Sequence, residues 1–374
     1  MADFAWTKRY PKGIPAKIEE LKHNSLVEMF EECFDKYADQ DAFENMGKSL
    51  TYKEVDVLSV NFASYLQNSF GLKKGDTIAI QMPNSLQYPI ALIGALRAGL
   101  KVVNTNPLYM PREMEHQFKD AEVKAIVIVE NFACNLEKII KNTKIEHVIV
   151  TGLGDLLGGL KGTIVNFVVK YIKKMVPSYN LPEAVKFNEA LKKGRSAKLV
   201  KPKLNLEDCA FLQYTGGTTG VSKGAMLSHK NVLSHTEQII WWFDPLLEVG
   251  KTETMITAIP LYHIFALTVN GVFMMKIGAK NVLITNPRDM KAFIGELKKQ
   301  DFTLMTGVNT LFNGLLNQAD FQNVDFSGLK ATIGGGMAVQ DFVAAKWQEV
   351  TGTALVEGYG LSETSPVLSC NPLD

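Results

Sequence analysis

The sequence predicts an α/β protein whose helices cover largely parallel β-sheets. Short β-rich runs alternate with longer helical patterns from residue 77 onward, and this alternation is typical of parallel strands joined by helices. The 374 residues are 46% hydrophobic and 21% charged, which is the composition of a folded protein with a sizeable core. A polar, lysine-rich stretch at residues 191–205 separates two βα-rich halves, and we place an internal boundary there.

The first βα unit is the clearest one. Residues 77–81 are a β-rich run, and residues 85–98 are a helical pattern that Asn84 can cap and Gly99 can end. Further β-rich runs follow at residues 124–129, 147–151, 209–214, 255–259, 281–284, 330–333 and 354–357.

Charge and cysteine usage exclude several classes of function. Forty Lys and Arg residues stand against 39 Asp and Glu residues, so there is no basic excess and we expect no nucleic-acid partner. The four cysteines lie far apart without a CxxC pair, which argues against a disulfide framework or a zinc site. Residues 1–15 lack the apolar stretch of a signal peptide, and no run reaches the roughly 18 apolar residues of a spanning helix, so a cytoplasmic location is expected.

Residues 160–176 have the pattern of a basic amphipathic helix. At about 100° per residue, apolar side chains share one face and lysines the other. The two sets are Ile164, Val165, Val168, Ile172 and Met175, and Lys170, Lys173 and Lys174. The favoured interpretation is a surface helix with its apolar side on the core, and the alternative is weak peripheral contact with an anionic membrane, such as the inner face of the cell membrane.

The most informative stretch is CAFLQYTGGTTGVSKG, residues 209–224. Its glycines let backbone N–H groups approach an anion, its hydroxyls add donors, and Lys223 adds a positive charge, so the loop predicts phosphate binding. It is not a Walker A loop, because Ser222 stands where the second glycine belongs. A plain glycine-rich turn is the alternative.

Read as a whole, YTGGTTGVSKG resembles the phosphate loop of the adenylate-forming, AMP-binding enzymes. Three later segments resemble further motifs of that family in the same order: PLYHIF at 260–265, GGGM at 334–337 and YGLSET at 359–364. The resemblance runs from about Asn24 to the C-terminus, and residues 104–109 and 307–312 narrow it to bacterial long-chain fatty-acyl-CoA ligases. It implies the N-terminal core of such an enzyme, with αβαβα layers and two interwoven βα-rich subdomains within residues 1–374.

Enzymes of this family activate a carboxylate with ATP to an acyl adenylate and pass the acyl group to coenzyme A. The resemblance implies that Lys223, His263 and Glu363 take part in catalysis, and that Thr215 and Glu363 hold Mg²⁺. The implied phosphate-binding residues are Tyr214, Thr215, Gly216, Gly217, Thr218, Thr219, Gly220, Ser222 and Lys223. For His263 a purely structural role is the alternative.

The resemblance also implies an adenine pocket and an acyl site. The pocket residues are Gly335, Gly336, Glu357, Gly358, Tyr359, Gly360 and Thr364, and the alternative for Tyr359 is a core aromatic. The acyl-site residues are Trp241, Trp242, His263, Val308 and Phe312, and packing is the alternative for the two tryptophans. A fatty acid, ATP and coenzyme A are thus the expected small-molecule partners, and a homodimer stays open.

The sequence ends ten residues after Thr364, before the family's ribose-binding TGD motif and its C-terminal lid domain. We therefore expect residues 1–374 to form little acyl-CoA alone. A non-catalytic nucleotide- or acyl-binding module, or one half of a split enzyme, is the alternative from another class. An acyl-AMP ligase that serves a carrier protein is the enzymatic alternative.

Overall fold

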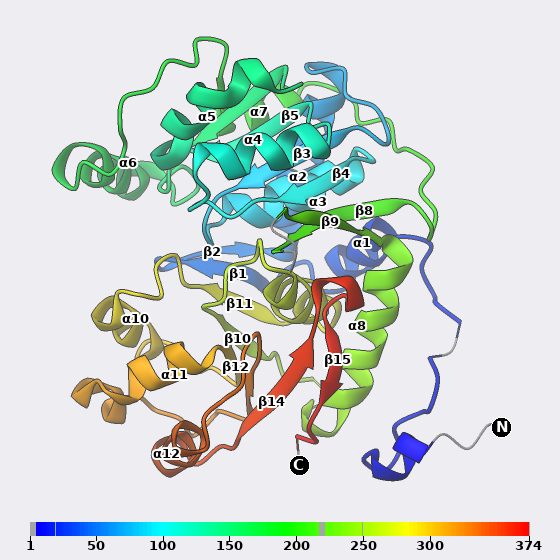
Figure 1. Cartoon of the computed structure of the whole chain (residues 1–374), viewed down its shortest axis with the longest axis vertical. Coiled ribbons are helices and arrows are strands. Elements are labelled where there is room, and N and C mark those ends of the chain that lie inside the picture. Colours follow the sequence, from blue (N-terminus) through cyan, green and yellow to red (C-terminus); the bar gives the residue numbers. More distant parts are fainter. Residues whose placement is uncertain (1–4, 19, 217–220, 249, 374) are drawn as a thin grey trace.

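Two sheets and their covering helices make up the fold, as expected for an α/β protein (Figure 1). The computed structural model describes residues 5–18, 20–216, 221–248 and 250–373. In the first sheet all neighbouring strands are parallel except the last pair. Its order is β7 (Val185–Lys186), β6 (His147–Thr151), β5 (Ala125–Val129), β3 (Thr77–Gln81), β4 (Lys101–Asn104), β8 (Cys209–Thr215) and β9 (Lys223–Ser228).

The second sheet is parallel in its centre and antiparallel at both edges. Its order is β15 (Val367–Cys370), β14 (Leu355–Gly360), β13 (Ala331–Gly334), β12 (Leu304–Gly307), β10 (Thr254–Thr257), β11 (Lys280–Leu283), β1 (Asp41–Asn45) and β2 (Lys48–Thr51). Each sheet thus takes strands from both sides of residues 191–205.

The helices form three layers around the two sheets. One outer layer is α4 (Pro111–Asp120) and α5 (Ala133–Ile139), and the other is α10 (Met290–Leu297), α11 (Asn309–Leu316) and α12 (Asp341–Thr351). The middle layer is α1 (Leu26–Lys36), α2 (Tyr52–Asn68), α3 (Gln87–Arg97), α7 (Phe187–Gly194), α8 (His229–Phe243), the π-helix η6 (Ala266–Phe273) and α9 (Met274–Lys276). The result is the αβαβα arrangement.

Strand alternation explains why the first sheet lies between two helix layers. Ile78 and Ile80 of β3 face the middle core, whereas Ala79 between them faces α4 and α5. In β5, Val127 faces the middle core and Ile126 faces the outer helices. Successive side chains of a strand point to opposite faces, so an uninterrupted apolar run is buried on both sides.

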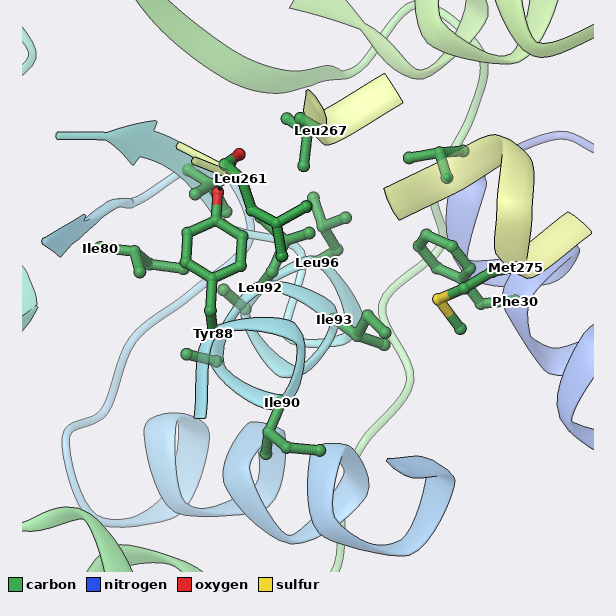
Figure 2. Close-up of a cluster of buried hydrophobic side chains, with 14 of the residues drawn as sticks. Phe30, Ile80, Tyr88, Ile90, Leu92, Ile93, Leu96, Leu261, Leu267 and Met275 are labelled. Atoms are coloured by element: carbon green, nitrogen blue, oxygen red, sulfur yellow. Dashed lines mark hydrogen bonds between the residues drawn. The ribbon is translucent and has the colours of Figure 1, made fainter. Parts of the chain in front are cut away.

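Helix α3 lies at the centre of the middle layer, and all its residues are buried. Figure 2 shows its side chains pointing to different neighbours, with Tyr88 directed toward Leu261 and Ile90 toward the adjacent helix. The Tyr88 hydroxyl lies 2.8 Å from the Leu261 carbonyl and 2.7 Å from Asn104 Oδ1. This helix therefore joins the first sheet to the segment that follows β10.

The predicted start of α3 was wrong by two residues, because Asn84 does not cap it. The Asn84 amide donates to the carbonyls of Thr257 (2.9 Å) and Ile259 (3.1 Å), and its Oδ1 accepts from the Leu261 N–H (2.8 Å). Asn84 thus connects the end of β3 to the segment after β10. The predicted end was one residue too late, because α3 ends at Arg97, but Gly99 does terminate the helix, with φ +79°.

The predicted helix at 160–176 consists of α6 (Gly159–Phe167) and the π-helical turn η4 (Val168–Ile172). Only part of its predicted apolar face is packed against the core. Val165 and Val168 are half-buried, but Ile164, Ile172 and Met175 are more than half exposed. The inward side instead includes Asn166, whose amide is hydrogen-bonded to the 152–155 loop.

Candidate functional site

The hairpin β8–β9 carries the predicted phosphate loop at its turn. Tyr214 pairs with Gly224 and Thr215 with Lys223 across it, so the side chain of Lys223 is exposed beside the tip. The predicted loop residues Gly217, Thr218, Thr219 and Gly220 lie outside the described residues.

Helix α4 holds this hairpin from one side. The Tyr214 hydroxyl donates to Asp120 Oδ2 over 2.5 Å, and burial together with this carboxylate raises the pKa of Tyr214 well above its usual range. His116 Nε2 lies 2.9 Å from the Ser222 carbonyl oxygen. The Tyr214 hydroxyl and the Ser222 backbone carbonyl are therefore engaged with protein groups, while Thr215 and Lys223 face the cavity.

The segment 260–265 places His263 at the cavity. Asn84 and Tyr88 hold Leu261, and Gln213 Nε2 donates to the Tyr262 carbonyl (2.6 Å). His263 Nδ1 accepts the N–H of Phe265 (3.3 Å), which leaves the proton of the neutral ring on Nε2. Burial lowers the pKa of His263, so the ring at neutral pH is an uncharged donor.

The glycine turn after β13 lies against this histidine segment. A Cβ on Gly335 would lie 2.9 Å from the Phe265 ring, and Gly336 has φ +78°, so both positions favour glycine. Glu357 Oε1 accepts the N–H of Val339 (2.6 Å), which fixes the turn to β14. The backbone at Gly335 and Gly336 is thereby open to the cavity.

The hairpin β14–β15 carries the YGLSET residues. Tyr359 is 60% exposed, so it is not a core aromatic. Thr364 Oγ1 donates within the turn, to the carbonyl of Pro366 (2.5 Å) or of Leu361 (3.0 Å), and accepts the N–H of Leu361 (3.2 Å). Glu363 is exposed on the 3-10 turn η8 (Ser362–Thr364) and lines the same cavity as Thr215.

The residues predicted to contact an acyl chain separate into two groups. Trp241 and Trp242 line the cavity from α8, and Trp242 Nε1 donates to the Asn371 carbonyl (3.1 Å). Val308 and Phe312 are not among the lining residues. Phe312 is fully buried and packs edge-on against Trp347, with ring centroids 4.8 Å apart.

Sequence reasoning missed several contributors to the cavity, among them His235 and residues near the N-terminus. His235 of α8 lines it and accepts the N–H of Val367 at Nε2 (3.2 Å), which ties α8 to β15. Residues 14–18 and Tyr10 also line it, and the Tyr10 ring packs edge-on against Trp242 with centroids 5.5 Å apart. Neither segment has a motif that would have identified it.

Together these elements surround one open cavity of about 1700 Å³. The lining residues that the sequence predicted are Thr215, Gly216, Lys223, Trp241, Trp242, His263, Gly335, Gly336, Gly358, Tyr359, Gly360, Glu363 and Thr364. Hydroxyls, a lysine, a histidine and a carboxylate thus converge on one space next to an apolar wall. Such an arrangement suits a ligand with both phosphate and apolar parts.

No helix within the described ranges is long and apolar enough to cross a membrane. Within the same ranges no group of three His, Cys, Asp or Glu side chains forms a metal cluster.

Several curated proteins similar to this chain have the same description, long-chain-fatty-acid--CoA ligase. A long-chain-fatty-acid--CoA ligase of Salmonella typhimurium is 55% identical over 369 residues, which are 99% of this chain and 66% of that protein. The ligase of the same description from Haemophilus influenzae is 51% identical over 370 residues, again 99% of this chain and 66% of that protein. The chain thus spans slightly less than two thirds of these curated relatives.

Solved structures agree on the fold. The chain superposes on an anthranilate CoA ligase in complex with anthranoyl-AMP with a TM-score of 0.80 at 20% identity, covering 95% of this chain and 63% of that one. A long-chain-fatty-acid-CoA ligase from Archaeoglobus fulgidus gives 0.78 at 22% identity, covering 97% and 69%. The model of the family described as "AMP-binding enzyme" matches residues 30–374. The chain belongs to the AMP-binding enzyme family.

Proposed function

We propose that this chain supplies the ATP- and acyl-binding core of a long-chain fatty-acid:CoA ligase, which forms an acyl adenylate and then transfers the acyl group to coenzyme A. The observation that carries the proposal is the convergence of Thr215, Lys223, His263 and Glu363 on one cavity. The relatives described as long-chain-fatty-acid--CoA ligases support the choice of substrate.

The first step requires a carboxylate to attack an anionic α-phosphorus, so charge must be neutralised on both partners. In this proposal Lys223 binds the β- and γ-phosphates beside backbone N–H groups of the loop. The Nε2–H of neutral His263 donates to the developing negative charge near the acyl carboxylate. Gly335, Gly336, Gly358 and Tyr359 hold the adenine, with the exposed Tyr359 ring available for stacking.

Mg²⁺ fits the donor set of the cavity. The Thr215 hydroxyl and the Glu363 carboxylate are hard oxygen ligands, and Mg²⁺ is usually held by one or two carboxylates together with substrate phosphates. When bound, the ion would neutralise phosphate charge and orient the polyphosphate. Glu363 would then orient this metal–nucleotide complex against Lys223.

The acyl chain is proposed to lie along Trp241 and Trp242, because burying each methylene against apolar surface contributes about 0.8 kcal/mol. The location of Phe312 in the core argues against direct contact of that side chain with the ligand. Val308 lies next to the glycine turn, 3.7 Å from a Cβ built on Gly336, and so borders the adenine side.

Calorimetric titration of the chain with Mg·ATP tests the nucleotide site. Lys223→Ala and Glu363→Ala should each weaken binding by roughly tenfold to a hundredfold, since a hydrogen bond to a charged group is worth about 1.5–3 kcal/mol. Lys346→Ala and Glu349→Ala on α12 are matched controls, because these two residues are exposed and pair with each other away from the cavity. Equal affinity in the parent and both cavity variants would remove the phosphate-loop assignment.

A further inference from the structure

Residues 159–175, which comprise α6, η4 and the three residues after η4, expose an unusual amount of apolar surface. Six large apolar side chains of this short segment are between 51% and 76% exposed, and they are Leu160, Ile164, Phe167, Tyr171, Ile172 and Met175. Four of them, Leu160, Ile164, Phe167 and Tyr171, recur every three or four positions within α6 and η4, so they follow one side of the helical segment, and Met175 lies just after it. A contiguous exposed patch of this kind marks an interaction surface in a folded protein.

The opposite side of the segment is fastened to the protein, so its orientation is fixed. Asn166 Oδ1 accepts the N–H of Gly154 (2.7 Å), and its amide donates to Asp155 Oδ1 (2.8 Å). A Cβ on Gly162 would lie 2.3 Å from the Gly154 carbonyl oxygen, so the helix backbone lies directly on that loop. Asn131 Nδ2 donates to the Met175 carbonyl (3.0 Å) at the other end. The exposed apolar stripe is therefore held outward.

The charge of this segment is entirely positive. Between Asp155 and Glu183 the sequence has four lysines and no acidic residue. These lysines, Lys161, Lys170, Lys173 and Lys174, are exposed, and none forms an ion pair with a carboxylate of the described chain. Positive charges beside an outward apolar stripe are complementary to a lipid bilayer, which has anionic headgroups at its surface and apolar acyl chains beneath them.

We propose that the outward side of residues 159–175 is a docking surface for an anionic phospholipid bilayer. Leu160, Ile164, Phe167, Tyr171 and Met175 enter the boundary between headgroups and acyl chains, and Lys170, Lys173 and Lys174 lie at the level of the lipid phosphates. Lys161 instead donates to the Met46 carbonyl. In Figure 1, α6 projects from the side of the molecule opposite to α8, which lines the cavity. Docking by α6 therefore leaves the α8 side of the cavity facing away from the lipid surface.

The proposal deepens the proposed function, because a long-chain fatty acid dissolves in bilayers and is concentrated at the surface where the protein would dock. Its test does not depend on that function. Binding to lipid is measured on the whole chain without nucleotide or fatty acid, so a failure of ligase activity leaves the result unaffected.

Sedimentation with vesicles of phosphatidylcholine, with and without phosphatidylglycerol, tests the docking surface. The parent chain should sediment only with the phosphatidylglycerol vesicles, and added salt should release it. Exchanging Lys170, Lys173 and Lys174 for Glu should lower the partition coefficient by about a hundredfold, given the usual attraction of each lysine to an anionic leaflet. The matched control exchanges Lys53, Lys198 and Lys291, which are exposed elsewhere, and should bind nearly like the parent.

The apolar stripe needs its own variant. Phe167→Ser with Tyr171→Ser should lower partitioning about tenfold or more, whereas Phe342→Ser, at a residue 62% exposed on α12, should not. The tryptophan fluorescence of Phe167→Trp should shift to the blue when vesicles are added and should be quenched by brominated lipid. The fluorescence of Phe342→Trp should show neither change. Unchanged thermal unfolding and Mg·ATP affinity would show that the variants are folded.

Three outcomes would overturn the proposal. Sedimentation of the lysine and aromatic variants like the parent would remove the surface altogether. If only the lysine variant failed to sediment with vesicles, the chain would be held by charge attraction without insertion of the apolar side chains into the bilayer. Concentration-dependent self-association of the parent that Phe167→Ser with Tyr171→Ser abolishes, without vesicle binding, would mean that a second copy covers the stripe.

Discussion

Two buried histidines should make the fold unstable in mild acid. Burial lowers the pKa of His229 and of His235 from 6.5 to about 4. His229 Nδ1 accepts the N–H of Leu26 (3.2 Å), and His235 Nε2 accepts the N–H of Val367 (3.2 Å). Protonation of either acceptor nitrogen would break its bond and bury a charge, so the native state resists it.

The sign follows from which state binds the proton first. The unfolded chain protonates these histidines near pH 6.5, and the native chain only near pH 4, so stability is complete above 6.5 and is lost between 6.5 and about 4. Between pH 7 and pH 5.5 each histidine should lower the free energy of unfolding by about 1.2 kcal/mol, and both together by about 2.5 kcal/mol. Ionised carboxylates titrate mainly below this window.

Urea unfolding followed by circular dichroism between pH 7 and pH 5.5 measures this dependence. His229→Gln and His235→Gln should each remove about half of the pH-dependent loss, while Ile239→Ala, a buried neighbour on α8, should lower stability without changing the slope. His263, whose pKa burial also lowers, should leave a small residual slope. A double histidine variant with the parent's full slope would refute the reasoning.

Two further predictions concern packing, and a third concerns a hydrogen bond. Gly194→Ala should destabilise the contact of α7 with α2 by several kcal/mol, because the new Cβ would lie 1.8 Å from the Asn61 carbonyl oxygen, and a drop in the thermal midpoint checks this. Trp347→Ala should cost about 3–5 kcal/mol in urea unfolding and Trp347→Phe much less, since this fully buried ring fills the core under α12. Trp242→Phe removes the donor to Asn371 and should speed amide exchange in β15 about fivefold, as expected for about 1 kcal/mol; unchanged exchange would contradict it.

The strands that could be predicted are those whose apolar runs are buried on both faces. Residues 77–81 and 147–151 were predicted with the observed bounds of β3 and β6, because TIAIQ and HVIVT are β-branched runs between polar turns. β1 and β2, with DAFEN and KSLT, have no such run, and tertiary pairing with β11 determines β1. Asn84 was misassigned because a local capping pattern cannot reveal partners more than 170 residues away.

The site residues that could be predicted are likewise those that lie in local sequence motifs, whereas those that depend on distant partners could not be predicted. Lys223, His263 and Glu363 belong to recognisable motifs, and the structure places all three on one cavity. His235 could not be found from the sequence, because its role depends on the N–H of Val367, 132 residues further along the chain. Phe312 lies next to a motif but points into the core, since its ring fills the space that Gly307 leaves. Adjacency in sequence therefore predicted which loops meet, but not which way each side chain points.

The position of β1 in the second sheet has a consequence for how the chain is made. Asn45 pairs with Leu283, 238 residues later, and its amide also donates to the Leu283 carbonyl (2.7 Å). At about 5–20 residues per second, a ribosome needs roughly 12–48 s between synthesising these two residues. During that interval the β1–β2 hairpin has an unpaired strand edge, which is prone to aggregation. Nascent chains should thus need protection of this hairpin until β11 leaves the ribosome, however stable the finished protein is.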